Sequence, residues 1–202
     1  MITFLKSKYG YRCTGIKLSY DGACVNMPSK KMRFCEAVNH SFNIPLLLKN
    51  SSLSCKGSQR SMGLLNSDKE LINHISNESK IPEHTISEAL LDIPVFEKPV
   101  ENIYLGILPE MEDIISPDMF ILQIKPKATM ELIKLYILKI NAVPIIKPYP
   151  FLSVCGNILV GSLKQKQMSI SFGCPESRRY GGVNDDNVIV GIPYNICNKF
   201  FN

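Results

Sequence analysis

Two segments in opposite halves of the 202-residue chain share one pattern of cysteine, serine, arginine and glycine. The first is Cys55-Lys-Gly-Ser58-Gln-Arg60-Ser-Met-Gly63, and the second is Cys174-Pro-Glu-Ser177-Arg178-Arg179-Tyr-Gly-Gly182. Both follow Cys-x2-Ser-x-Arg-x2-Gly. A cysteine thiolate is a nucleophile and a metal ligand, and an arginine side chain binds an oxyanion through two parallel hydrogen bonds. The pattern therefore predicts a site for thiol, metal or anion chemistry.

A further cysteine precedes each motif at nearly the same distance. Cys35 stands 20 residues before Cys55, and Cys155 stands 19 residues before Cys174. Both lie in similar apolar phrases, Phe34-Cys35-Glu-Ala-Val38 and Val154-Cys155-Gly-Asn-Ile158. We interpret this correspondence as an internal duplication, in which two copies of one supersecondary unit pack together. We call Cys35, Cys55, Cys155 and Cys174 the repeat cysteines.

One hypothesis is a thiol-based enzyme for sulfur transfer or redox chemistry. Cys174 and Cys55 are the candidate catalytic residues, because a neighbouring arginine lowers a thiol pKa and favours the reactive thiolate. The spacing Cys-x4-Arg resembles the active loop of rhodanese-type sulfur transferases. Since Arg178 and Arg179 both stand near Cys174, we expect this thiol to be the more reactive of the two.

A second hypothesis is a metal centre. If the repeat cysteines meet across a pseudo-two-fold axis, they supply four sulfur ligands for zinc or for an iron–sulfur cluster. Neither pair forms a compact Cys-x2-Cys, so the spacing neither requires nor forbids such a site.

The principal hypothesis is a structural or small-ligand role without catalysis. Free cysteine is among the most buried residue types, and the apolar phrases around Cys35 and Cys155 suit a place in the core. Backbone amides and side chains of a tight loop also converge on small anions. The candidate ligand-binding residues are Ser58, Arg60 and Gly63 in the first motif and Ser177, Arg178, Arg179 and Gly182 in the second.

The composition is that of an ordinary globular protein with a sizeable core, at 45% hydrophobic and 20% charged residues. The net charge is +5, but the lysines and arginines are scattered, which argues against a nucleic-acid partner. No apolar run reaches the ~18 residues of a membrane span, and the first residues do not resemble a secretion signal. We therefore expect a cytoplasmic protein without a membrane partner, in which seven cysteines favour free thiols, metal ligands or redox chemistry.

Strand and helix patterns are mixed along the chain. The apolar run 119–124 predicts a strand that is buried on both faces. Helical spacing predicts helices over 31–42, 67–77, 130–140 and 194–201, and a helix over 153–163 is the expected second copy of the Cys35 helix. Both motifs are expected as loops at strand ends. This pattern indicates an α+β or α/β fold, with pseudo-two-fold duplicated strand-helix-strand units packed as one globular domain, residues 1–202, in two halves of about 1–100 and 101–202.

Several phrases together resemble a family catalogued only as domain of unknown function 169. They include Phe34-Cys35-Glu-Ala, Gly173-Cys174-x-x-Ser177-Arg178 and Val190-Gly-Ile-Pro193. The resemblance runs from about residue 15 to residue 193 and implies an archaeal or bacterial cytoplasmic protein. It implies no established activity and assigns no catalytic residue. The sequence also leaves the oligomeric state open.

Overall fold

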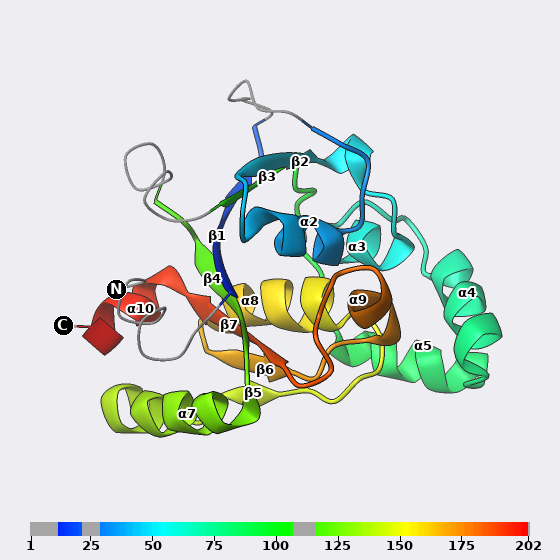
Figure 1. The fold of residues 1–202 in the computed structure, drawn as a ribbon. Coiled ribbons are helices and arrows are strands. Elements are labelled where there is room, and N and C mark those ends of the chain that lie inside the picture. Colours follow the sequence, from blue (N-terminus) through cyan, green and yellow to red (C-terminus); the bar gives the residue numbers. More distant parts are fainter. Residues whose placement is uncertain (1–11, 22–28, 107–115, 202) are drawn as a thin grey trace.

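The computed structural model describes residues 12–21, 29–106 and 116–201 (Figure 1). Its centre is a seven-stranded sheet in the order β2-β3-β1-β4-β7-β6-β5. The strands are β1 (Arg12–Ser19), β2 (Leu46–Lys49), β3 (Asn102–Gly106), β4 (Met119–Ile124), β5 (Ile145–Ile146), β6 (Ser169–Ser171) and β7 (Val188–Pro193). Neighbouring strands run antiparallel, except that β5 and β6 are parallel. The fold is therefore α+β, as the sequence predicts.

The helices vary in length and type. They are α2 (Phe34–Ser41), the 3-10 turn η1 (Asn50–Ser52), α3 (Lys56–Ser61), α4 (Lys69–Ser79), α5 (Glu83–Asp92), α7 (Pro126–Ile140), the π-helix η2 (Ser153–Val160), α8 (Gly161–Gln165), α9 (Pro175–Arg179) and α10 (Tyr194–Phe201). Figure 1 shows α2, α3, α8 and α9 grouped together, with α4 and α5 paired beyond α3.

Both faces of the central strands are covered. In β4, Met119 and Ile121 face a core shared with α2 and η2, while Phe120 and Leu122 face a core shared with α7 and α10. Successive side chains of a strand point to opposite faces, so a strand between two helical layers is apolar at every position. All six residues of β4 are buried, which confirms the predicted doubly covered strand.

The strand order is the same on both sides of the central β1–β4 pair. Outward from this antiparallel pair, the order is β1-β3-β2 on one side and β4-β7-β6 on the other. On each side the outer strand is preceded by a helix that carries a repeat cysteine, α2 or η2, and is followed by a short helix, α3 or α9. Strand β5 extends the second side alone.

The predicted ends of β4 and α10 are confirmed, and the predicted helix over 153–163 is present as the π-helix η2 followed by α8. The expectation that both motifs are loops is wrong. Each motif cysteine is the N-cap of a short helix, and in the second motif Cys174 and Ser177 form a capping box at its first turn.

Gly191 in β7 provides a test of how closely η2 and α8 pack on the sheet. A Cβ atom here would lie 2.6 Å from Ser162 Oγ, 2.8 Å from Ile158 Cγ2 and 2.9 Å from Met119 Cε. Because three buried groups would have to move, we expect Gly191→Ala to lower the free energy of unfolding by about 1–3 kcal/mol in urea denaturation.

The matched control is Gly161→Ala. A Cβ atom at Gly161 would meet nothing closer than 3.6 Å, and its backbone is already helical. The stability of this variant should stay equal or rise by up to about 1 kcal/mol. Equal losses at both glycines would contradict the close packing described for β7.

Candidate functional site

The four repeat cysteines line one cavity of about 160 Å³. Cys35 comes from α2, Cys55 from the start of α3, Cys155 from η2 and Cys174 from the start of α9. The opposite wall is formed by α4 and by the segment 150–152. Cysteines up to 139 positions apart in the sequence thus line the same cavity.

Each repeat cysteine stands at or near the N-terminus of its helix. Cys35 is the second residue of α2 and Cys155 is the third residue of η2, while Cys55 and Cys174 are the N-caps of α3 and α9. The first turn of a helix has backbone N–H groups without intrahelical partners and carries a partial positive charge. Four such ends around one cavity favour negative charge on the sulfur atoms.

The spacing Cys-x2-Ser has a structural explanation. In the second motif the Cys174 amide donates to Ser177 Oγ at 2.8 Å, and the Ser177 amide donates to the Cys174 sulfur. In the first motif the Ser58 amide and hydroxyl likewise interact with the Cys55 sulfur. Both serines are buried. The serines therefore orient the cysteine side chains, and Ser177 also helps to cap α9.

Arg60 of the first motif and Arg178 of the second bind backbone carbonyl groups. Arg60 donates to Leu90 O at 2.8 Å and Ile93 O at 2.9 Å, and it pairs with Asp68 at 2.8 Å. The Arg60 guanidinium thus connects α3 with the C-terminal end of α5. None of the motif arginines is among the described residues that line the cavity.

The second motif uses a different arginine for the same purpose. Arg178 donates to Phe172 O and Asn184 O, although Arg179 occupies the position that corresponds to Arg60. Arg179 is exposed and lies over the Tyr180 ring at 5.2 Å. The duplicated spacing therefore does not place equivalent guanidinium groups.

The last glycine of each motif reverses the chain after the short helix. Gly63 has φ +74° and Gly182 has φ +60°, which are left-handed conformations that favour glycine. A Cβ atom at Gly182 would also lie 2.5 Å from Asn39 Nδ2 on α2. Gly63 and Gly182 are not among the described residues that line the cavity, whereas Ser58 is.

Burial dominates the ionisation of three of the thiols. It raises the pKa of Cys35 and of Cys55, and it raises the pKa of Cys155 to about 12. Neighbouring repeat cysteines raise the pKa of Cys35 and of Cys155 further, because one thiolate repels the next. At neutral pH these groups are therefore thiols until a cation displaces their protons. The preferential reactivity of Cys174 stays a prediction.

The distances between the sulfur atoms bear on the kind of metal group. A single zinc ion with bonds of ~2.3 Å holds four sulfur atoms about 3.8 Å apart. Within the described part of the chain, no three of the cysteine sulfurs lie within 4.8 Å of one another. The four sulfurs thus surround a space wider than a single zinc ion requires.

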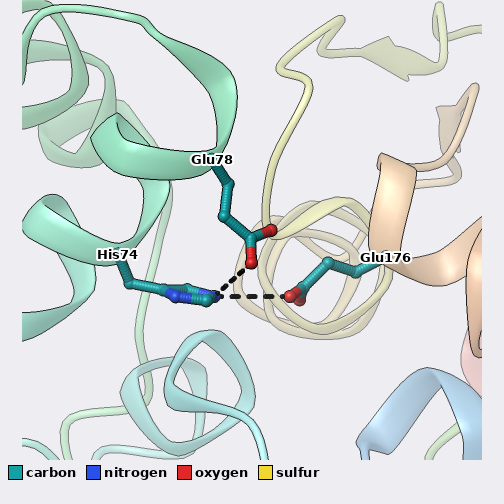
Figure 2. Close-up of side chains that lie close together, drawn as sticks. All are labelled: His74, Glu78 and Glu176. Atoms are coloured by element: carbon teal, nitrogen blue, oxygen red, sulfur yellow. Dashed lines mark hydrogen bonds and ion pairs between the residues drawn. The ribbon is translucent and has the colours of Figure 1, made fainter.

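Charged residues at the cavity mouth were not singled out in the sequence. Glu176 Oε2 accepts from Arg33 Nη1 at 2.7 Å and from Cys55 Sγ at 3.6 Å, while its Oε1 lies 3.5 Å from His74 Nε2. Figure 2 shows Glu176 facing His74 and Glu78 of α4. Two features of the sequence could have indicated this cluster: Glu176 lies inside the second motif, and His74 and Glu78 have i, i+4 spacing.

The remaining described cysteines lie away from this cavity. Cys13 and Cys197 are buried in the core beneath α7 and α10, and Cys24 is outside the described residues. Among the helices that the structure describes, none has the length and apolar character needed to cross a bilayer.

The chain is thus an α+β protein in which four cysteines at or near helix N-termini line one cavity. The chain belongs to the family known as domain of unknown function 169, described as uncharacterised ArCR, which matches residues 8–202. This confirms the resemblance seen in the sequence. Comparisons with curated proteins and with solved structures found no match.

The contrast between Arg60 and Arg179 tests the structural role of the motif arginines. Arg60→Ala leaves two carbonyl groups and Asp68 without this donor, so we expect a loss of about 1–3 kcal/mol in the free energy of unfolding. Arg179→Ala removes an exposed side chain and should change stability by less than about 0.5 kcal/mol. Urea denaturation followed by circular dichroism measures both. A larger loss for Arg179→Ala would contradict these roles.

Proposed function

We propose that the protein binds an iron–sulfur cluster through the thiolates of Cys35, Cys55, Cys155 and Cys174. The observation that carries this proposal is that two cysteines from each half line one cavity. Four cysteine thiolates are the usual ligand set of such clusters. The principal sequence hypothesis, a structural or small-anion role, has less support, because the motif arginines bind carbonyl groups elsewhere.

A cluster suits the cavity better than one zinc ion. The sulfurs are spread more widely than around a single ion. The cavity of about 160 Å³ is many times larger than the space that one water needs, so a group of several atoms fits where one ion would leave empty space.

The electrostatic setting also suits a cluster. A cluster held by four thiolates carries net negative charge, and hydrogen bonds to its sulfurs stabilise that charge. Four helix N-termini and the amides of Ser58 and Ser177 supply such stabilisation. The guanidinium of Arg33 adds positive charge, since it lowers the pKa of Cys35 and of Cys55 against the effect of burial.

The matching strand orders support the predicted duplication. Each half contributes one cysteine from the helix before its outer strand and one from the short helix after it. We place the boundary between the halves after β3 rather than near residue 100, because β3 pairs with β1 and β2. The cluster would then lie between two related halves, and a reducing cytoplasm would preserve its free thiols.

Thiol catalysis is less well supported. Burial keeps Cys35, Cys55 and Cys155 protonated, and Cys174 is only 9% exposed. A second candidate function is the binding of a small apolar molecule, which is favoured by the side chains of Leu71, Ile75 and Phe151 in the opposite wall. A dry cavity of ~150 Å³ is known to hold a ligand as large as benzene.

Anaerobic purification followed by iron and sulfide analysis tests the cluster. We expect about four iron and four sulfide per chain for a [4Fe–4S] centre, with a broad visible charge-transfer absorption. Replacement of any one repeat cysteine by serine should reduce the bound iron severalfold, because each supplies one ligand.

The matched control is Cys197→Ala, which removes a buried thiol far from the cavity and should leave the iron content unchanged. One zinc per chain instead of iron would overturn the cluster in favour of a single-ion site. Protein that takes up neither iron nor zinc after anaerobic reconstitution would leave the small apolar ligand as the better proposal.

A further inference from the structure

We infer a second metal site at the mouth of the cavity, in which His74, Glu78 and Glu176 bind one divalent first-row transition-metal ion. This site uses nitrogen and oxygen ligands and contains none of the repeat cysteines. It goes beyond the proposed cluster and does not depend on it.

Two separate elements bring the three ligands together. His74 and Glu78 are four residues apart on α4, so their side chains lie one above the other on the same face of that helix. Glu176 is the second residue of α9 and points toward them, as Figure 2 shows. All three residues line the cavity.

The distances fit a shared ion better than hydrogen bonds. His74 Nε2 lies 3.5 Å from Glu176 Oε1 and 4.0 Å from Glu78 Oε1. An N–H···O hydrogen bond spans about 2.7–3.2 Å. Around an ion with bonds of ~2.1 Å, two neighbouring ligand atoms lie about 3.0 Å apart in octahedral geometry and about 3.4 Å apart in tetrahedral geometry. The His74–Glu176 separation is close to these values, whereas the exposed Glu78 side chain has to move closer to His74.

The surroundings fix the innermost ligand. Glu176 Oε2 accepts from Arg33 at 2.7 Å and from Cys55, so the other oxygen, Oε1, is directed at His74. Outer partners of this kind orient a metal-binding carboxylate. The two carboxylates balance the charge of a divalent cation, and the neutral imidazole supplies the third ligand. Three protein ligands leave further coordination positions open to water or to a ligand in the cavity.

Manganese separates this site from the cysteines. Carboxylate and water ligands suit Mn²⁺, whereas thiolates select softer ions such as zinc and iron–sulfur clusters. The experiment is a titration of the full chain, as purified anaerobically, with Mn²⁺ alone, in which free Mn²⁺ is measured by its electron paramagnetic resonance signal.

We expect one Mn²⁺ per chain, and we expect His74→Ala and Glu78→Gln each to weaken binding by about tenfold or more. The matched control is Glu70→Gln on the same helix, because Glu70 pairs with Lys56 at 2.7 Å and lies outside the cluster. Side chains of His74, Glu78 and Glu70 are 46%, 65% and 77% exposed, so all three variants should fold, which circular dichroism checks.

No saturable Mn²⁺ binding, or equal binding by the wild type and by His74→Ala, would overturn the site and leave an ion pair between His74 and the two glutamates. The iron content of the same samples reports on the cluster separately. Mn²⁺ binding by protein without iron would support the second site even if the cluster proposal fails.

Discussion

The antiparallel pairing of β1 with β4 is the constraint on which the candidate site depends. This pair lies at the middle of the sheet and joins its two sides, and α2 and η2 pack against each other on one face. The segment after α9 also lies close to α2, because a Cβ atom on Gly181 would lie only 2.9 Å from Cys35 Cβ. The cavity is thus a product of the whole sheet and not of either motif alone.

Burial and helix ends act on the repeat cysteines in opposite directions. Burial favours neutral thiols and raises the pKa of Cys35, Cys55 and Cys155. Helix N-termini and capping amides favour negative sulfur. Four buried sulfurs are stable as protonated thiols, and a bound cation would shift the balance to thiolates. A packed core does not need helix N-termini that favour thiolates, and an exposed nucleophile does not need burial. A metal centre benefits from both.

Much of the fold was predictable because its signals are local. The apolar run of β4 and the periodicity of α10 indicated their bounds correctly, and the repeated cysteines indicated a relation between distant segments. The helical state of the motifs was missed, since Gly57 and Gly63 suggest a loop and a thiol is an unusual N-cap. The roles of Arg60 and Arg178 depend on carbonyl groups far along the chain, which no local pattern reveals. His74 and Glu176 meet for the same long-range reason.

The long separation between Cys35 and Cys174 has a consequence for biosynthesis. These residues are 139 positions apart, so at ~5–20 residues per second the ribosome needs on the order of ten seconds to complete the set of four. During that time the first half exposes two thiols and the unpaired edge of β1, which is the kind of surface that aggregates or meets a chaperone. Any cofactor that requires all four sulfurs can therefore be bound completely only after Cys174 has been translated.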